Sequence, residues 1–298
     1  MTVLVTGATG SVGRLVTGHL LAAGVRVRAL TRNPAAAALP DGAEVWEGDL
    51  LRPDTLRAAL HGVERLYLFP VPETARAVVS AAEETGVRRI VVLSSSSVLD
   101  TSGDNHSGEH HRAVERAVEE SGVEWTFVRP DEFASNVLWK WAESIRTEGV
   151  VRAPYGAAPR VPVHEADVAD VAAAALLEDG HAGQAYLLTG PEVITQTGQV
   201  RAIAKALGRP VAFEEITPDQ ARKAMAAAMP APVVEMVLRY LADAVAHPPV
   251  PVDTVERVTG RPARTFARWA ADHAADFAPR PAADPLRRRA PQDEEPAA

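Results

Sequence analysis

Two adjacent histidines, His110 and His111, lie in the segment SGEHHRAVE at residues 107–115, where the sequence pattern predicts the start of a helix. An imidazole has an ordinary pKa of about 6.5, so a histidine can donate a proton near neutral pH. Neighbouring helical residues point about 100° apart, so the two rings are not expected to face one site. We assign the role of proton donor or substrate anchor to His111 and keep His110 as the second catalytic candidate. An ordinary solvated helix surface is the alternative for both.

The same segment also permits a metal-site interpretation. His106 and His110 are four residues apart on one face of the predicted helix, and Glu109 is adjacent. Histidine pairs with this spacing occur in zinc sites, where a third protein ligand completes the set. The sequence offers no recognisable third ligand, so we expect no metal.

A glycine series opens the chain: Gly7, Gly10 and Gly13 stand in VLVTGATGSVGRLV, after a predicted strand and at the start of a predicted helix. Glycines at such a turn permit a tight bend, a close approach of a pyrophosphate and close packing of the helix. The first turn of the helix then offers free N–H groups to the phosphates. We therefore predict a dinucleotide site that also includes Thr9 and Val12.

The second predicted strand indicates which dinucleotide binds. NAD-preferring folds end this strand with an acidic residue that binds the ribose hydroxyls, but here the strand ends in ALTRNP, with Arg32. A guanidinium suits a 2′-phosphate, so the sequence favours NADPH, and Arg14 can add a second positive charge. Asp49, in EGDL, is a candidate to accept a hydrogen bond from the adenine amino group, with an ordinary turn role as the alternative.

A run of serines, Ser94–Ser97, ends a predicted strand at 88–95. Ligands bind at the carboxyl ends of the strands in open α/β sheets, so Ser95 and Ser96 are candidates to hydrogen-bond a substrate carbonyl or the nicotinamide. Serines at strand ends are also ordinary turn residues. His164 begins the helical segment HEADVADV, and we interpret it as a helix cap.

Composition excludes several classes of protein. The chain has 298 residues, a formal net charge of −8 and no cysteine. The negative charge disfavours a nucleic-acid or anionic-membrane partner, and the lack of cysteine excludes disulfides, thiolate catalysis and cysteine-bound metals. The chain begins directly with a predicted strand and has no apolar run of about 20 residues, so we expect neither a signal peptide nor a membrane span. We expect a cytoplasmic protein.

Strands and helices alternate up to about residue 130, which predicts a Rossmann-type, doubly wound parallel α/β sheet. The predicted strands are 2–6, 25–31, 43–48, 64–69, 88–95 and 124–130. A helix at 131–148, a strand near 160–164, a helix at 165–179 and a strand at 184–190 follow, and then helix-rich sequence from 195 to 277.

These elements suggest a division of the chain into three parts. Residues 1–150 form the NAD(P)-binding Rossmann core. Residues 151–278 hold the remaining core elements and a small, mainly helical C-terminal substrate lobe. Residues 279–298 are rich in proline and charge without periodicity, which predicts a disordered tail.

The motifs VTGATGSVG, TRNP, GDL, the serine run after IVVL, and WTFVRPDEF together resemble the NmrA-like branch of the atypical short-chain dehydrogenases. That family includes NADPH-dependent quinone reductases, isoflavone-reductase-like enzymes and redox-sensing regulators that bind a dinucleotide without turning it over. The resemblance covers about residues 1–277 and implies a C-terminal lobe that closes a substrate cleft over the nicotinamide. It places Pro130 near the nicotinamide, and Phe133 and Asn136 toward the substrate.

Two further aromatic residues belong to the predicted helix after the sixth strand. Trp139 and Trp141 are two positions apart, so they face different sides of that helix. We expect one of them in the core and the other at the wall of a pocket for a flat, apolar substrate, and we assign Trp139 to the substrate.

The segment with the two histidines is where the sequence departs from the family. The resemblance places His111 where isoflavone-reductase-like members have a catalytic lysine, and Ser107 where other dehydrogenases have a tyrosine. A serine is a poor general acid, so the tyrosine–lysine mechanism is not available.

The leading functional prediction is an NADPH-dependent oxidoreductase that reduces a small carbonyl, quinone or enone substrate by hydride transfer. A non-catalytic NADP(H)-sensing regulator and a redox-neutral cyclase or isomerase are the alternatives, because both also suit a site without the tyrosine. The sequence says little about oligomeric state, and a homodimer is compatible with it.

Overall fold

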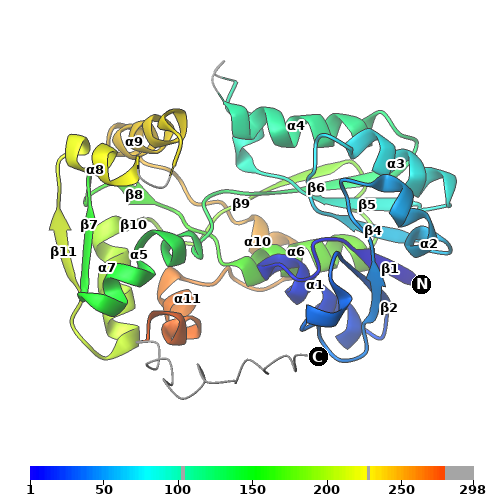
Figure 1. The fold of residues 1–298 in the computed structure, drawn as a ribbon, viewed down its shortest axis with the longest axis horizontal. Helices are drawn as coiled ribbons and strands as arrows, with labels where there is room; N and C mark the ends of the chain where they lie inside the picture. The colour runs from blue at the N-terminus through cyan, green and yellow to red at the C-terminus, as the bar shows by residue number, and fades with distance from the viewer. Residues whose placement is uncertain (102–104, 227–228, 279–298) are drawn as a thin grey trace, which may run out of the picture.

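Short apolar runs form the strands of one parallel sheet (Figure 1). The computed structural model describes residues 1–101, 105–226 and 229–278, so the expected disordered tail at 279–298 lies outside the described residues. The strands of this sheet are β1 (Thr2–Val5), β2 (Arg26–Thr31), β3 (Glu44–Glu47), β4 (Arg65–Leu68), β5 (Arg89–Leu93), β6 (Glu124–Pro130) and β9 (Gln184–Leu188). Their order is β3-β2-β1-β4-β5-β6-β9, and every neighbouring pair is parallel. The predicted Rossmann-type sheet is confirmed.

Helices cover both faces of this sheet because its central strands are apolar on both sides. One face carries α1 (Ser11–Ala22) and α6 (Glu165–Leu177), and the other carries α2 (Arg57–Leu60), α3 (Ala75–Glu84) and α4 (His106–Glu119). In β1, Val3 and Val5 pack with α1 and α6, whereas Leu4 packs with the opposite layer. Short 3₁₀ helices occur at η1 (Pro34–Ala36), η2 (Pro53–Leu56), η3 (Ser96–Leu99) and η4 (Ala274–Phe277).

A second unit, the lobe, packs around its own apolar cluster, which includes Trp141, Ile145, Phe266 and Trp269. Its helices are α5 (Asn136–Thr147), α7 (Gln196–Leu207), α8 (Pro218–Met225), α9 (Ala231–Ala246) and α11 (Phe266–Asp272). It also contains two small sheets, in which β7 (Val150–Ala153) pairs with β11 (Ala212–Glu215) and β8 (Pro159–Arg160) pairs with β10 (Ile194–Thr195). The lobe therefore includes α5, on the N-terminal side of the expected boundary at residue 150.

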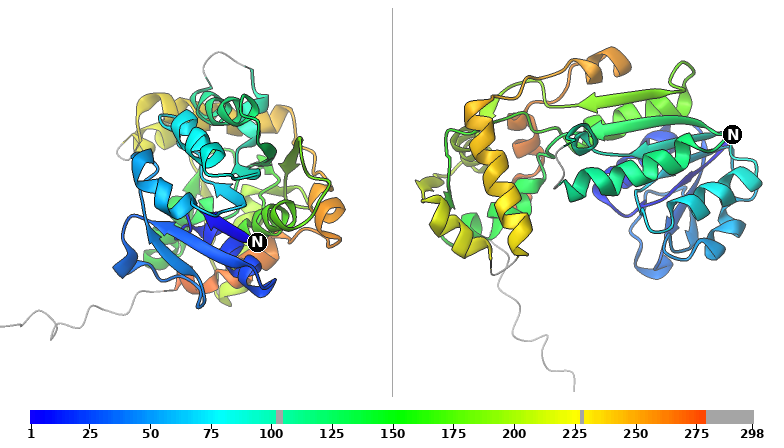
Figure 2. Two further views of the ribbon diagram at one scale, coloured as in Figure 1. Left: turned by 90° about the vertical axis from the view of Figure 1, so that its right-hand side faces the viewer. Right: turned by 90° about the horizontal axis from the view of Figure 1, so that it is seen from above.

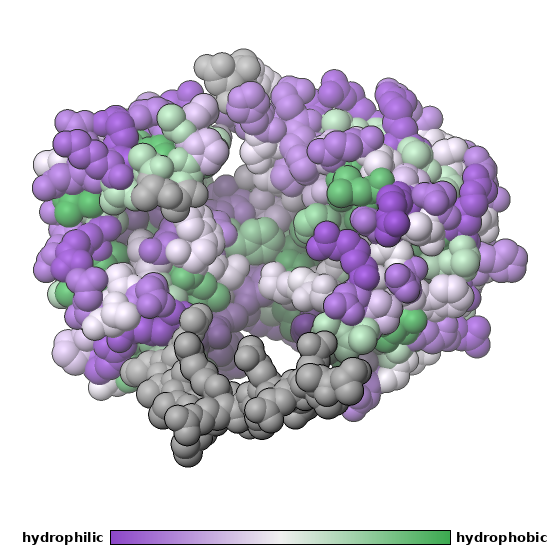
Figure 3. Space-filling view, in the orientation of Figure 1, coloured by the Kyte–Doolittle hydropathy of each residue, from purple (hydrophilic) through white to green (hydrophobic). Residues whose placement is uncertain are grey.

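The lobe and the sheet lie side by side (Figures 1 and 2). The carboxyl ends of the strands point toward the lobe, and the space-filling view is hollowed between the two units (Figure 3). The chain crosses this boundary repeatedly, because α6 and β9 return to the sheet after α5, and α10 (Thr254–Thr259) packs on α6 after α9.

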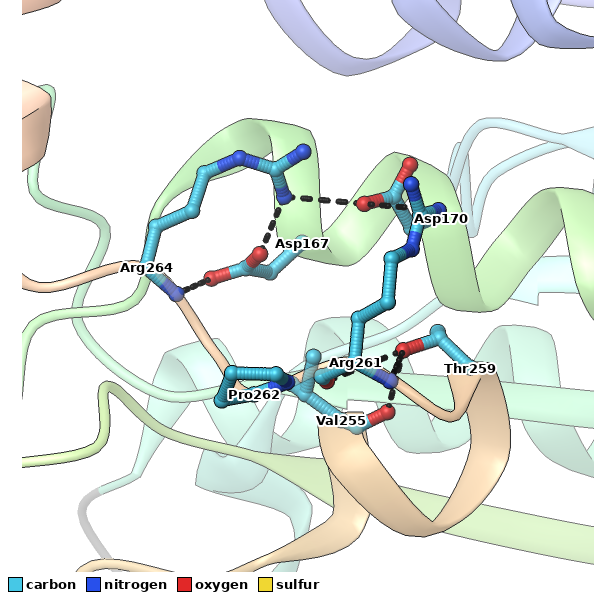
Figure 4. Close-up of a pocket in the computed structure, with 7 residues that line it drawn as sticks. All are labelled: Asp167, Asp170, Val255, Thr259, Arg261, Pro262 and Arg264. Atoms are coloured by element: carbon cyan, nitrogen blue, oxygen red, sulfur yellow. Dashed lines mark hydrogen bonds and ion pairs between the residues drawn. The ribbon is translucent and has the colours of Figure 1, made fainter.

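The N-terminal turn of α6 ties the C-terminal segment to the core. His164 caps α6, and its Nδ1 accepts a backbone N–H at 3.0 Å, which confirms the predicted capping role. Asp167 accepts the backbone N–H of Arg264 at 2.8 Å, and the guanidinium of Arg264 bridges Asp167 and Asp170 (Figure 4). On the other side, Nε2 of His19 in α1 lies 2.9 Å from Oδ1 of Asp170. These contacts join α1, α6 and the segment before α11.

A second contact of the same turn involves Glu165, which is buried. The indole N–H of Trp269 donates to Oε2 of Glu165 at 3.1 Å, and Nε2 of His273 lies 2.6 Å from Oε1. The hydrogen bond to Glu165 raises the pKa of His273 to about 9, although burial opposes the charge. His273 is therefore protonated at neutral pH, and its ion pair holds the end of α11 against α6.

The start of α1 packs directly on the turn that follows β1. Gly7 has a φ of +60°, a conformation that favours glycine. A Cβ on Gly13 would lie 2.3 Å from the carbonyl oxygen of Gly7, closer than any side chain can approach backbone. The short distance between α1 and the turn therefore depends on the absence of a side chain at Gly13.

We predict that Gly13→Ala lowers the free energy of unfolding by about 1–3 kcal/mol, because the new methyl group must push α1 away from the turn. Gly18→Ala is the matched control in the same helix, since a Cβ at Gly18 would meet nothing within 4 Å. This control should raise the free energy of unfolding by about 0.5–1 kcal/mol through helix propensity. Denaturant titrations measure both changes, and equal stability of Gly13→Ala and the wild type would contradict the packing argument.

Candidate active site

The turn after β1 has the features of a phosphate site. Gly10 occupies the N-cap of α1 and supplies no side-chain cap, and the first turn of α1 contains no acidic residue. The N–H groups of this turn are therefore uncapped, and the helix dipole favours an anion there. Thr9 is exposed, whereas the Val12 side chain is buried, so Val12 presents only its backbone to the loop. A dinucleotide pyrophosphate fits this glycine cradle.

The order of the strands reverses between β1 and β4, which is where open α/β sheets bind their ligands. Thr6 joins the two strand ends, since its hydroxyl donates to the carbonyl of Tyr67 at 2.9 Å and accepts the N–H of Phe69 at 2.7 Å. The Phe69 side chain lies against Gly7 and is 45% exposed. Sequence reasoning missed this aromatic surface beside the phosphate loop, although an aromatic residue directly after a strand signals it.

The predicted cofactor-selecting residues follow β2 and β3. Arg32 is exposed and Arg14 is half-buried, and neither makes an ion pair with a described residue. Both guanidinium groups are thus available to an anion. Asp49 is used locally: Oδ1 accepts the N–H of Leu51 at 3.0 Å, and Oδ2 lies 3.6 Å from Nε of Arg52. This is the turn role that we gave as the alternative, and the contact with adenine stays a prediction.

The serine run lies at the carboxyl end of β5, as predicted, and its hydroxyls have different partners. Ser95 caps η3, where its Oγ accepts the N–H of Ser97 at 3.2 Å. Ser96 donates to Oδ1 of Asp131 at 3.0 Å. Oγ of Ser97 lies 3.1 Å from Oγ of Ser107, so the first turn of α4 is tied to the serine run. The run therefore connects β5 with both β6 and α4.

The two histidines of α4 have different environments. Nδ1 of His111 lies 2.9 Å from the carbonyl oxygen of Ser107, and because a carbonyl only accepts, Nδ1 carries the proton. Burial lowers the pKa of His111, so the ring is neutral at pH 7, and its Nε2 has no partner among the described residues. His110 is exposed, and its Nε2 lies 3.4 Å from the carbonyl oxygen of Pro70.

A buried ion pair lies one helical turn after His111. Glu115 is 3% exposed and accepts two hydrogen bonds from the guanidinium of Arg129, both at 2.8 Å. Ser94 donates to the same carboxylate at 2.6 Å. The three residues connect α4, β6 and the end of β5. Sequence reasoning missed this network, although an acid on an otherwise apolar helix face indicates a buried partner.

Two adjacent acids, Asp131 and Glu132, follow β6. Oε1 of Glu132 lies 2.7 Å from Nζ of Lys140, and Oε2 lies 2.6 Å from Nε of Arg160. Although burial opposes ionisation, these two cations lower the pKa of Glu132 to about 2. Burial raises the pKa of Asp131 above its ordinary value. Sequence reasoning named neither acid.

The residues expected near the substrate lie in and after the same segment. Pro130 ends β6 and is buried beside β9, while Phe133 and Asn136 are half-buried where the chain enters the lobe. Trp141 belongs to the lobe core, and Trp139 is 59% exposed with Nζ of Lys140 5.4 Å from its ring centroid. The expectation that one tryptophan is buried is confirmed, and the contact of Trp139 with substrate stays a prediction.

Across the described ranges, no group of three or more histidine, cysteine, aspartate or glutamate side chains comes together as a metal site. His106 is exposed at the start of α4.

Among the helices that the structure describes, none combines the length and the hydrophobicity that crossing a membrane requires.

Similarity to known proteins identifies the family of this chain. The profile described as NAD(P)H-binding matches residues 7–179. The chain is 45% identical over 285 residues to a (4-alkanoyl-5-oxo-2,5-dihydrofuran-3-yl)methyl phosphate reductase of Streptomyces griseus subsp. griseus, which covers 93% of this chain and 99% of that relative. It is 36% identical over 289 residues to an NAD(P)H azoreductase of Xenophilus azovorans, over 92% of this chain and 99% of the relative.

Among solved structures, an NADPH-dependent quinone oxidoreductase of Escherichia coli matches with a TM-score of 0.76 and 26% identity. That match covers 91% of this chain and 99% of the other. The resemblance found in the sequence is confirmed by these relatives. With its glycine cradle inside the matched region, the chain belongs to the NAD(P)H-binding family.

Proposed function

We propose that this chain is an NADPH-dependent reductase that transfers a hydride to a small, electron-poor conjugated molecule such as an enone, an unsaturated lactone or a quinone. One arrangement carries the proposal. The uncapped N-terminus of α1 and the polar cluster after β5 and β6 lie along the same carboxyl edge of the sheet, beside the hollow between core and lobe (Figure 3). A dinucleotide whose pyrophosphate binds at the N-terminus of α1 would place its nicotinamide beside a substrate bound at the polar cluster.

The names of the relatives support this substrate class. A 4-alkanoyl-5-oxo-2,5-dihydrofuran has a ring double bond conjugated to carbonyl groups, and azo compounds and quinones are conjugated acceptors as well. Each takes up a hydride at one atom and a proton at another. A site for them must hold a flat molecule against the nicotinamide and supply one proton.

The chain's own residues supply the cofactor contacts. Backbone N–H groups within residues 7–13 hold the pyrophosphate, and Arg32, with Arg14, meets the 2′-phosphate of NADPH. Asp49 accepts a hydrogen bond from the adenine amino group through a carboxylate lone pair that its turn does not use. NADPH, when bound, supplies the hydride.

The substrate contacts come from the ends of β5 and β6 and from α4. In the proposal, the hydroxyl of Ser95 donates to a substrate carbonyl, while the single O–H of Ser96 stays with Asp131 at the edge of the substrate site. His111 anchors a hydroxyl of the substrate through Nε2, which accepts. The remaining contacts in the proposal are Pro130 beside the nicotinamide and Phe133, Asn136 and Trp139 around the substrate.

We further propose that the protein works in the cytoplasm on small molecules, without a nucleic-acid partner, and that it can form a homodimer. The lack of cysteine suits a reducing compartment, and a net charge of −8 repels polyanions.

We predict that NADPH binds at least about tenfold more tightly than NADH, a difference of about 1.4 kcal/mol, because only NADPH offers a 2′-phosphate to Arg32. Arg32→Ala should remove this preference. Arg26→Ala is the matched control, because Arg26 is an exposed arginine at the opposite end of β2 and pairs with Glu44. Isothermal titration calorimetry measures the affinities, and equal affinities in the wild type would refute the assignment.

The reductase activity is tested with NADPH and a panel of acceptors: an acyl-substituted butenolide, a quinone, an enone and, for comparison, a saturated ketone. We expect the conjugated acceptors to be reduced faster than the ketone, with loss of reduced-nicotinamide absorbance and gain of one hydride and one proton in the product. Binding of NADPH without oxidation by any acceptor would instead support a sensor. Conversion of a substrate without consumption of NADPH would support a redox-neutral enzyme.

For the histidines, we predict that His111→Ala lowers kcat by about tenfold or more, within the range of a positioned polar group, and that His110→Ala has little effect. Only His111 combines partial burial with a nitrogen that is free to accept. Affinity for NADPH should stay within about twofold in both variants, since the phosphate contacts lie elsewhere. Wild-type turnover in His111→Ala would show that the ring is only a surface group.

A further inference from the structure

Asp131 and Glu132 are adjacent carboxylic acids, but they differ in the groups that contact them. Both oxygens of Glu132 are paired, one with Lys140 and the other with Arg160. Asp131 makes no ion pair with a described residue, and the partner of its Oδ1 is the neutral hydroxyl of Ser96 at 3.0 Å. Glu132 is thus held by two cations, whereas Asp131 is held by a neutral hydroxyl.

We propose that Asp131 is the proton donor of the reductase reaction, held in place by Ser96 where β5 and β6 end. This proposal rests on the proposed function and names the group that supplies the proton for the reduction.

The position of Asp131 suits this role. It follows Pro130 at the carboxyl end of β6, and its backbone N–H donates to the carbonyl of Leu188 at 2.9 Å. Ser96 comes from the serine run at the end of β5, so the bond between them spans the edge where the ligand is expected. The side chain is half-buried, which lets it regain a proton from solvent.

Burial is the main influence on the pKa of Asp131, and it raises this pKa. The charge of Glu132 makes a smaller contribution in the same direction. The hydrogen bond from Ser96 and the charge of Arg160 act in the opposite direction, but the balance is a raised pKa. Glu132, with a pKa of about 2, stays ionised. Neighbouring titratable groups with pKa values pushed apart are typical of an acid and its electrostatic partner.

The proton balance of the reaction is complete with Asp131. The hydride forms a C–H bond at the β carbon of the conjugated substrate, and the electron pair of its double bond moves toward the carbonyl to give an enolate. The α carbon of the enolate then bonds the proton of Asp131, and the O–H electron pair stays on the carboxylate. The substrate is reduced, the nicotinamide is oxidised, and the carboxylate regains its proton from water.

The first test needs neither cofactor nor substrate. Infrared spectra of the ligand-free protein, recorded across pH, follow the carbonyl stretch of protonated carboxyl groups. We expect Asp131→Asn to remove a component whose midpoint lies above the ordinary aspartate pKa of about 3.9. Ser96→Ala should move this midpoint upward, because it removes a hydrogen bond to the ionised form. Asp41→Asn, the same change at an exposed loop residue, should leave it in place.

The second test measures turnover with a conjugated acceptor. Asp131→Asn should lower kcat by about 10²-fold or more and leave the affinity for NADPH unchanged, while Asp41→Asn should behave as the wild type. The proposal is overturned by a midpoint at or below about 3.9, by a midpoint so low that the carboxyl is ionised at the pH where turnover is measured, or by wild-type turnover in Asp131→Asn. A wild type that reduces no acceptor would instead refute the proposed function, and the infrared titration would still decide whether Asp131 is the neutral acid.

Discussion

The buried pair of Arg129 and Glu115 is the interaction on which the geometry of the site depends. It joins α4 to β6, and the hydroxyl of Ser94 extends it to the end of β5. Removal of one partner of such a pair costs about 3–5 kcal/mol because the other charge stays buried. Each proposed catalytic group lies close to a member of this network in the chain: Ser95 and Ser96 follow Ser94, Asp131 follows Arg129, and His111 precedes Glu115 by one turn. The network therefore fixes the positions of α4, β6 and the end of β5 relative to one another.

Some charged groups at this edge of the sheet are paired with an opposite charge and others are not. The cations nearest the cluster are paired with Glu132 or Glu115, whereas the arginines near the phosphate loop have no carboxylate partner in the described part of the chain. The acids of the α6 turn are paired as well, with Arg264 and His273. Arginines without an ion-pair partner thus lie where a dinucleotide phosphate is expected, and Asp131, without an ion-pair partner among the described residues, lies where the proposal places the proton donor.

The fold and the cofactor loop followed from the sequence because both depend on local patterns. Apolar strands alternate with amphipathic helices, and Gly7 to Gly13 form a loop whose chemistry is contained in one short segment. The polar cluster did not follow, since Ser96 and Asp131 are 35 residues apart and meet only when β5 and β6 pair. In the small sheets of the lobe, the predicted strand near 160–164 overlaps β8 (Pro159–Arg160), whereas β10 has two residues, too few for an alternating pattern. The sequence did not predict β7 and β11 as strands either.

The repeated crossing of the chain between sheet and lobe has a consequence for the integrity of the protein. The lobe is not a segment attached by one linker, because α6, β9 and α10 return to the core between its helices. A single proteolytic cut in any one connection would therefore leave both units held by the remaining connections and by the contacts of Glu165 and Asp167 with the C-terminal segment. For the same reason the lobe cannot be exchanged with that of a relative by one recombination point.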